Sequence, residues 1–268
     1  MTKTMRVIPA IIAALVLATS PAAAADEAPI CADRPSKSTG PCTVPPGHAQ
    51  IETSLIDWSR DTPGGDRTEL TAVGGSLVKY GVGERADIEL GFTPFETLHV
   101  RSAHSNEDHS SFGDVLLRVK YRLTAEGAAV EVALDPFAKL PTANHHLGNG
   151  KLEAGLVAPI SAQFGNGPLT LSLGPELDWL ADEDGHGHHA ATQQVVNLAL
   201  AVSDRLSLSA ELWAMRDWDP AGTGKRASAD GAIAFAVTNE LQLDAGANVG
   251  LNEQTPDVEF YTGLSVRF

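Results

Sequence analysis

Histidine is unevenly distributed along this sequence, and most of the histidines fall in three polar stretches. Seven of the nine belong to these stretches: His104, His109, His145, His146, His186, His188 and His189. Carboxylates lie among them, and imidazole with nearby carboxylate suits Zn²⁺ or Cu²⁺. We therefore consider these residues candidate metal ligands, with a response to pH as a second use of the same imidazoles. The alternative is a solvated polar surface on which the histidines bind nothing.

A second chemically active set consists of charged residues that alternate with apolar ones. Between 114 and 122, for example, Arg118 and Lys120 alternate with Leu117 and Val119. Successive side chains of a β-strand point to opposite faces, so this pattern predicts one polar and one apolar face. We predict that the polar face carries Asp87, Glu89, Asp114, Arg118, Lys120, Arg122, Glu131, Asp135, Lys139, Glu153, Glu176, Asp178, Glu211, Asp244 and Arg267.

The elements that position these residues repeat about twelve times. Each is an alternating segment of about 9–11 residues or slightly more, the length that crosses a bilayer as a tilted strand. The segments are 48–58, 67–81, 86–97, 112–123, 128–140, 151–165, 168–181, 191–202, 205–218, 226–237, 241–252 and 257–268. The pattern predicts an all-β fold, a transmembrane up-and-down antiparallel β-barrel.

The connections between the segments alternate in length. Short turns are expected at 82–85, 124–127, 165–167, 203–204 and 238–240, and long polar loops at 59–66, 101–111, 141–150, 182–190, 219–225 and 253–256. Outer-membrane barrels have tight periplasmic turns and longer extracellular loops. The three histidine-bearing stretches would then lie on one extracellular rim.

The charged face must point into the barrel, because a charge near the middle of the lipid face costs about 2–4 kcal/mol. Arg118 and Lys120 lie on a basic segment between two acidic ones, which allows ion pairs across neighbouring strands. Two interpretations remain open: a salt-bridge network that fills a narrow barrel, and a polar path through which small solutes diffuse.

The amino terminus has the layout of a secretory signal. Lys3 and Arg6 precede an apolar run at 7–17, and small residues lead to an expected cleavage after Ala25. The expected organisation is a cleaved signal peptide at 1–25, a periplasmic segment at 26–46 and an outer-membrane barrel at 47–268. In the oxidising periplasm of a Gram-negative bacterium, Cys31 and Cys42 are expected to form a disulfide.

Composition and motifs exclude several other classes. The formal net charge of −15 disfavours nucleic-acid binding, which needs a basic surface. A G-x-S-x-G nucleophile motif is absent from the sequence, and glycine pairs such as Gly165 and Gly167 are typical of turns rather than phosphate loops. We expect no enzyme and, apart from Zn or Cu at the histidines, no cofactor.

Several longer pieces resemble a known family of bacterial outer-membrane barrels, the meta-pathway phenol-degradation proteins, which are also called transporters. The pieces are TVPPGHAQIE (43–52), LVKYGVGERADIELG (77–91), GDVLLRVKYR (113–122) and PFAKLPT (136–142). The resemblance covers nearly the whole chain after the signal. It implies a twelve-stranded barrel that helps aromatic or other hydrophobic compounds cross the outer membrane. The histidine-rich stretches depart from this family's pattern.

The expected partners follow from the same interpretation. They are outer-membrane lipids, a small-molecule solute and the barrel-assembly machinery. The final strand ends in Phe268, which resembles the terminal aromatic signal that barrels present for assembly. A metal-binding or receptor-like barrel with a closed lumen is the alternative function.

Overall fold

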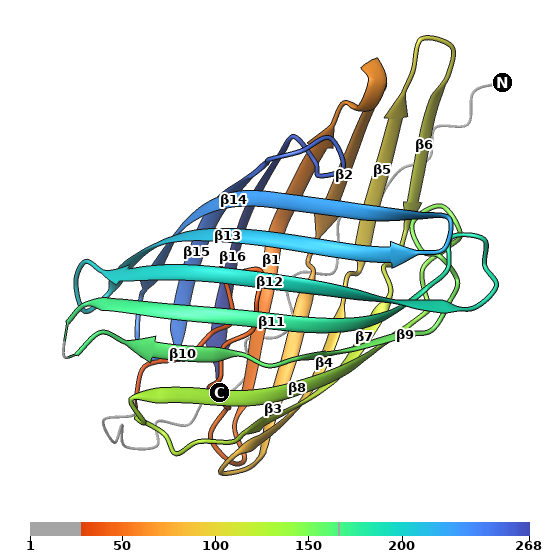
Figure 1. The fold of residues 1–268 in the computed structure, drawn as a ribbon. Coiled ribbons are helices and arrows are strands. Elements are labelled where there is room, and N and C mark those ends of the chain that lie inside the picture. The colour runs from red at the N-terminus through yellow and green to blue at the C-terminus, as the bar shows by residue number, and fades with distance from the viewer. Residues whose placement is uncertain (1–27, 166) are drawn as a thin grey trace, which may run out of the picture.

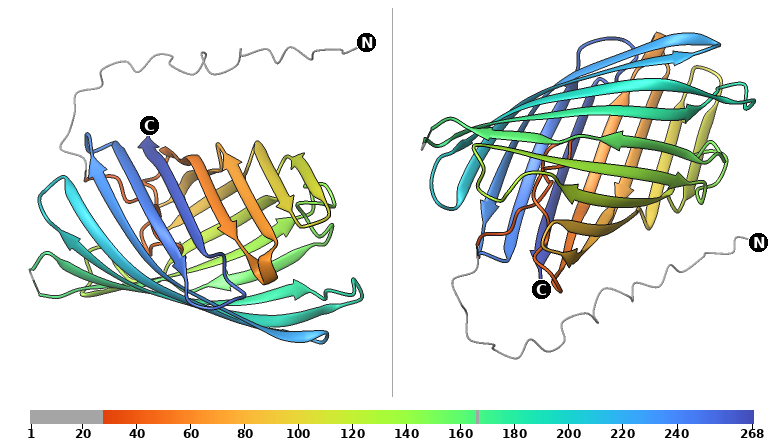
Figure 2. Two further views of the ribbon diagram at one scale, coloured as in Figure 1. Left: turned by 90° about the horizontal axis from the view of Figure 1, so that it is seen from above. Right: turned by 60° about the horizontal axis from the view of Figure 1, so that its bottom comes forward.

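The computed structural model describes residues 28–165 and 167–268, and it consists almost entirely of β-strands. The expected signal peptide at 1–25 therefore lies outside the described residues. The strands pair antiparallel around one sheet, and β16 pairs with β1, which closes the sheet into a barrel (Figures 1 and 2). The elements are β1 (Ala49–Asp61), a 3-10 turn η1 (Pro63–Gly65), β2 (Arg67–Val73), β3 (Ser76–Gly83), β4 (Ala86–Phe92), β5 (Phe95–Arg101), β6 (Asn106–Ser111), β7 (Val115–Arg122), β8 (Val130–Leu140), β9 (Glu153–Val157), β10 (Ile160–Gln163), β11 (Leu169–Ala181), β12 (His188–Ala201), β13 (Leu206–Asp219), β14 (Gly222–Ala236), β15 (Leu241–Gly250) and β16 (Val258–Arg267).

Four of the twelve barrel crossings consist of two strand segments each: β2 with β3, β4 with β5, β6 with β7, and β9 with β10. Between β2 and β3, Gly74 has a φ of 73°, and the facing strand β1 has an irregularity between Ser54 and Ile56. Pro94 and Pro159 interrupt two other crossings, since proline has no N–H to donate to a neighbouring strand. The predicted all-β, twelve-stranded antiparallel barrel is confirmed.

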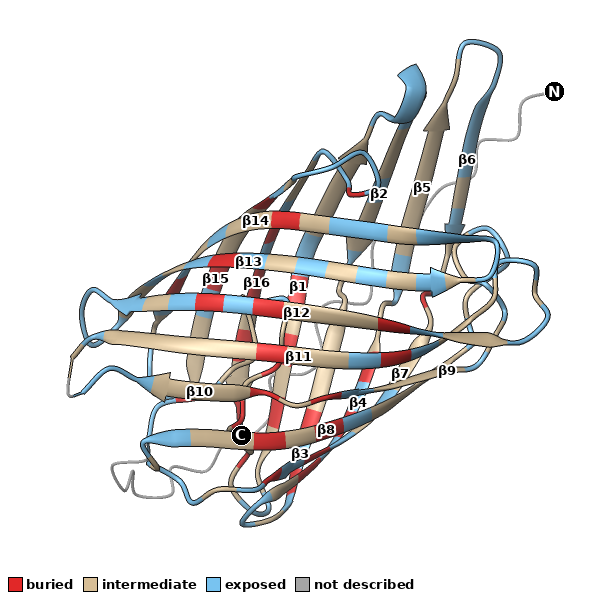
Figure 3. Ribbon diagram, viewed as in Figure 1, coloured by how far each residue is buried: buried red, intermediate tan, exposed pale blue. Residues whose placement is uncertain are grey.

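The two faces of the wall differ as the alternation predicts. On β12, for example, Leu198 and Leu200 are exposed on the outer face, whereas Asn197 between β11 and β13 is buried on the inner face. Figure 3 shows buried positions alternating with exposed ones along the strands. The exposed leucines, valines and aromatic residues form an apolar outer surface that fits lipid.

Among the described residues, no helix is long and apolar enough to cross a membrane.

Two of the expected long loops are largely strand. Residues 101–111 continue the hairpin of β5 and β6, which projects beyond the rest of the barrel in Figure 1. At 219–225, Asp219 pairs directly with Gly222, so only a two-residue turn separates β13 from β14. Both faces of a strand meet water above the bilayer. The apolar alternation therefore ends there, although the backbone hydrogen bonds continue.

We expected a periplasmic segment at 26–46, but residues 30–44 of this segment lie inside the barrel. Residues 30–44 thread between the strands and contact several of them, including β1, β3, β7, β13 and β15 (Figure 2). We call residues 30–44 the plug. The barrel end that carries Ala49 and Arg267 is called the terminal end, and the opposite end the loop end.

Candidate functional site

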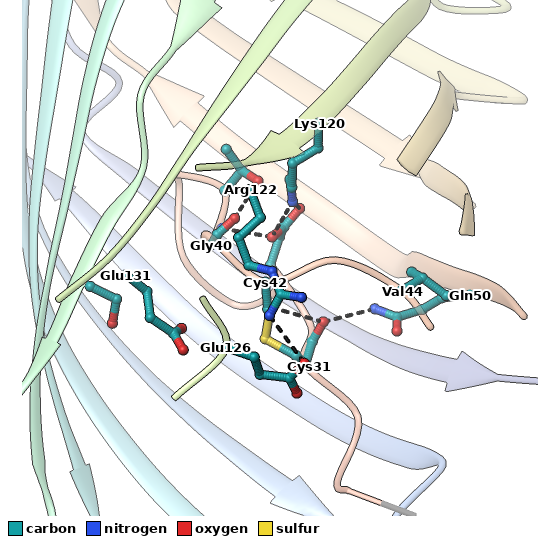
Figure 4. The surroundings of a disulfide bond; sticks show 12 residues. Cys31, Gly40, Cys42, Val44, Gln50, Lys120, Arg122, Glu126 and Glu131 are labelled. Carbon is teal, nitrogen blue, oxygen red and sulfur yellow. Dashed lines mark hydrogen bonds and ion pairs between the residues drawn. A yellow bond between two sulfur atoms is a disulfide. The ribbon is translucent and has the colours of Figure 1, made fainter. Parts of the chain in front are cut away.

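The plug is a compact loop that is fastened to the wall near both of its ends. The predicted disulfide between Cys31 and Cys42 is present and closes the loop inside the barrel (Figure 4). The Gln50 side chain donates a 3.0 Å hydrogen bond to the carbonyl of Cys31, and the Val44 backbone N–H lies 3.0 Å from both carboxylate oxygens of Asp87. The loop ends are therefore held by β1 and β4.

Asp33 is the ionic centre of the plug. Its carboxylate lies 2.6 Å from the Lys79 ammonium and 3.0 Å from the Lys120 ammonium, and both lysine side chains are buried. Burial by itself raises the pKa of Asp33. The positive charges of Lys120, Lys79 and Arg118 outweigh that effect and hold the pKa well below its ordinary value. Asp33 is therefore charged at neutral pH and joins the plug to β3 and β7.

The ionic network continues into the wall beyond Asp33. Lys79 also pairs with Glu52, and Lys120 lies 3.4 Å from Glu89. The Arg118 guanidinium forms an ion pair with the Asp135 carboxylate at 2.5 Å. Each charge of this network thus faces at least one opposite charge, which offsets the cost of removing the ions from water.

The other half of the plug binds the opposite wall. Arg34 makes two hydrogen bonds to Asp244, of 3.1 and 2.7 Å, and a third of 2.7 Å to Ser54. The Ser36 hydroxyl and the Lys37 backbone N–H both donate to Glu211. The plug therefore bridges strands β1, β13 and β15 across the lumen.

Glycines on the inner wall make room for the plug. A Cβ at Gly174 would lie 1.9 Å from the Ser38 hydroxyl oxygen, and one at Gly263 would lie 2.4 Å from the guanidinium of Arg34. At Gly81 a Cβ would lie 2.5 Å from the carbonyl oxygen of Val44, the last residue of the plug. Even the smallest side chain at these positions would force the plug to move.

Space remains on both sides of the plug. A cavity of about 430 Å³ lies toward the loop end, and Leu77, Phe92, Leu116, Asp57 and Arg118 are among its lining residues. We call it the vestibule. A second cavity of about 170 Å³ lies between the plug and β11–β14, beside residues that include polar Asn197 and Ser209 and apolar Val195.

The structure places all fifteen charged residues predicted for the polar face on the inner side of the wall or at its rim. Buried are Asp87, Glu89, Lys120, Arg122, Asp135, Asp178, Glu211, Asp244 and Arg267, and half-buried are Asp114, Arg118, Glu131, Lys139, Glu153 and Glu176. They do not form one site. One group of these residues contacts the plug, a second group lies at the loop end, and a third lies at the terminal end.

At the loop end, Lys139 links two carboxylates, Asp114 at 3.0 Å and Glu153 at 2.9 Å. Further along the wall, the Gln193 amide donates to Glu176 at 3.1 Å and to Asp178 at 2.8 Å. These contacts tie neighbouring strands together above the plug without filling the vestibule.

At the terminal end, arginine side chains link turns and strands. Arg122 pairs with Glu126 and also donates to the carbonyl of Glu84, while Glu131 accepts the backbone N–H of Gly127. Arg267 pairs with Glu240 at 2.6 Å.

The histidine stretches do not converge on a single site. His109 of β6 stacks on His146 with ring centroids 3.6 Å apart, and His145 lies 3.9 Å from His146. Loss of water around the rings lowers the pKa of His146, and charge on His109 or His145 would lower that pKa further. The lowered pKa favours the neutral form of the His146 imidazole. His104 lies apart, on the exposed turn between β5 and β6.

The third stretch separates into three environments. His186 is exposed, and the His188 ring stacks on Trp179 while its Nε2 lies 2.8 Å from the carbonyl oxygen of Leu152. His189 is buried among Asp182, Asp217 and Asp219 at the start of β12. The three histidines of this stretch therefore do not lie in one site.

Comparison with known proteins agrees with this geometry. The model of the family described as "Putative MetA-pathway of phenol degradation" matches residues 32–268. The chain belongs to this family. We call it the MetA-pathway family. The match begins at residue 32, within the plug, so it covers most of the plug together with the barrel. A search of curated protein sequences gave no match.

Solved structures with the same architecture are outer-membrane barrels. The COG4313 outer membrane channel of Pseudomonas putida F1 is 16% identical, with a TM-score of 0.66 over 84% of this chain and 97% of that one. The β domain of the Bordetella autotransporter Brka is 10% identical, with a TM-score of 0.52 over 83% and 100%. The translocator domain of the autotransporter NalP from Neisseria meningitidis is 15% identical, with a TM-score of 0.50 over 83% and 88%. At these identities the likeness shows the fold alone.

Proposed function

We propose that this MetA-pathway family member is a passive outer-membrane channel for small solutes, in which the plug narrows the path. The observation that carries the proposal is the space on both sides of the plug inside a closed barrel, about 430 Å³ toward the loop end and about 170 Å³ beside β11–β14. Residues of the plug line both cavities, so the plug separates them.

The lining of the vestibule favours small molecules with both apolar and polar parts. Leu77, Leu116 and Phe92 offer apolar contact, and Asp57 and Arg118 offer polar contact within the same cavity. Pockets that bind small molecules combine apolar walls with a few polar groups in this way. A small aromatic compound such as a phenol fits this chemistry, and the family's description supports that class.

The proposal places the protein in the outer membrane of a Gram-negative bacterium, with the terminal end in the periplasm after removal of residues 1–25. The apolar outer surface supports contact with outer-membrane lipids. Strand β16 and the exposed Phe268 that follows it support recognition of the last strand by the barrel-assembly machinery.

Conductance of the refolded protein in planar bilayers tests the proposed function. We expect small unitary currents that favour cations, because acidic residues outnumber basic ones on the inner wall and exclude anions. Liposomes containing the protein should also swell in small neutral solutes. Membranes carrying protein without any unitary current, together with liposomes that do not swell, would contradict the proposal.

A further inference from the structure

Three carboxylates surround one imidazole at the loop end of the barrel, away from the plug. His189 is the second residue of β12, Asp182 directly follows β11, and Asp217 and Asp219 lie at the end of β13. The side chain of His189 is 6% exposed, and those of Asp182 and Asp219 are 11% exposed. Because one imidazole carries at most a single positive charge, the cluster keeps a net negative charge that a divalent cation can neutralise.

The donor atoms of this cluster are spaced like metal ligands. The Nδ1 of His189 lies 2.8 Å from Oδ1 of Asp182 and 3.4 Å from Oδ2 of Asp219, and ligand atoms of these three residues lie within 4.8 Å of one another. In a tetrahedral Zn²⁺ site with bonds of about 2.0 Å, neighbouring donor atoms are about 3.3 Å apart. The observed separations fall on either side of that value.

The surrounding groups already hold these donors in place. Asp219 accepts the backbone N–H groups of Glu183 at 2.8 Å and of Ala221 at 2.6 Å. Gly187 has a φ of 118°, and a Cβ there would lie 2.6 Å from a carboxylate oxygen of Asp182. The turn is therefore shaped around the Asp182 carboxylate.

Asp217 lies on the other side of the His189 ring from Asp182 and Asp219. Its Oδ1 lies 2.6 Å from Nε2 of His189, the ring nitrogen that faces away from Asp182 and Asp219. Both atoms are buried, and neither has a partner of hydrogen-bond geometry among the described residues. A histidine that binds a metal usually donates its second N–H to a carboxylate, which fixes the ring and strengthens the ligand.

We propose that His189, Asp182 and Asp219 bind one divalent transition-metal ion such as Zn²⁺, with Asp217 orienting the imidazole and water completing the coordination. The ion fastens the β11–β12 turn to the end of β13 on the outer rim. His186 and His188 are not ligands, and neither is the stacked trio of His109, His145 and His146. The site lies outside both cavities, so it is independent of the proposed channel function.

Calorimetric titration of Zn²⁺ into the refolded barrel tests the site. All proteins compared carry His145→Ala and His146→Ala, which removes competition from the stacked trio. One high-affinity ion per chain is expected. Asp217→Asn should weaken binding by about 10–100-fold, and His189→Ala, Asp182→Asn or Asp219→Asn should weaken it further. The matched control, His186→Ala in the same turn, should bind with unchanged affinity.

A spectroscopic measurement on the same proteins covers the case in which His189→Ala does not fold. The electron paramagnetic resonance spectrum of bound Cu²⁺ should show coupling to a single imidazole, which both Asp182→Asn and Asp219→Asn should perturb. Coupling to two or more imidazoles would overturn the proposal. So would Zn²⁺ affinity that depends on His186 and not on Asp182 or Asp219.

Discussion

Deletion of residues 30–44 should raise the single-channel conductance several-fold. The plug bridges β1, β13 and β15 on one side and β3 and β7 on the other, so it crosses the lumen between the two cavities. A twelve-stranded barrel encloses more room than the eight-stranded barrels that side chains fill. Without the plug, the vestibule and the smaller cavity join into one path. Planar-bilayer recordings of the deletion protein beside the full chain measure the change.

Single substitutions at wall glycines provide a milder version of the same experiment. Gly174→Leu should displace Ser38, and Gly263→Leu should displace Arg34, because a Cβ at either position already overlaps the plug. Both should raise conductance, by less than the deletion does. Gly231→Leu is the matched control, since a Cβ there faces the outer surface and meets only one atom, at 3.9 Å. Equal conductance in the unaltered protein and in all three glycine variants would show that the plug does not narrow the path.

Replacement of Asp33 by asparagine should release the plug. Asp33 faces the buried ammonium groups of Lys79 and Lys120 at 2.6 and 3.0 Å. Loss of one partner of a buried ion pair costs about 3–5 kcal/mol. We expect the lower end, about 3 kcal/mol, because Lys79 keeps Glu52 and Lys120 keeps Glu89. That energy corresponds to about a hundredfold change in the equilibrium between the docked and the undocked plug, in favour of the undocked form. The open probability of single channels measures this change.

The lowered pKa of Asp33 determines the pH at which Asp33→Asn should be compared with the unaltered protein. The folded-state pKa of Asp33 is lowered, so its stabilising effect is present above the ordinary carboxyl pKa of 3.8 and is lost only as the pH falls toward the folded value. Recordings at neutral pH therefore compare a charged carboxylate with an amide.

Two variants control the Asp33 experiment. Lys37→Met removes an ion pair with Glu259 whose side chains are about a quarter exposed. Pairs exposed to solvent contribute about 0–1 kcal/mol, so the open probability should change little. Asp33→Glu keeps a negative charge beside Lys79 and Lys120 and should release the plug less than Asp33→Asn does. Similar open probabilities for Asp33→Asn and Lys37→Met would show that the buried network does not hold the plug.

The alternation of apolar and polar residues was sufficient to predict the wall. The pattern around Arg118 and Lys120 gave the inward face correctly, because lipid on one side imposes a period of two along every strand that crosses it. The same argument fails beyond the bilayer. Residues 106–111 of β6 and the start of β14 are polar on both faces, so their strands carry no period that the sequence could reveal.

The plug could not be predicted from periodicity, because residues 30–44 form no regular element. Its contacts also join residues about 200 positions apart, such as Arg34 with Asp244. A signal was nevertheless present on the wall. Gly81, Gly174 and Gly263 fall on the inward face of their strands, where a missing side chain indicates close approach of other backbone or side-chain atoms.

The histidines show what composition leaves undetermined. Their clustering in sequence made them candidate metal ligands, yet the three histidines at 186–189 divide between an exposed residue, a ring stacked on Trp179 and a buried imidazole among aspartates. Two of those aspartates, Asp217 and Asp219, come from the end of another strand. Only the register of β12 with β13, in which Ala191 pairs with Asp217, brings them to His189.

Chemical cross-linking of the unaltered protein in membrane vesicles tests most directly whether the plug occupies the lumen. The Lys37 ammonium lies 3.3 Å from the Glu259 carboxylate, and both side chains are about a quarter exposed, so a carbodiimide can reach them. Because this reagent adds no spacer, it joins only groups already in contact. We predict an amide between Lys37 and Glu259 in the digested protein. Two results together would contradict the account. Lys37 would form no amide with any carboxylate of the inner wall, and it would react fully with a bulky amine-reactive reagent that cannot enter the barrel.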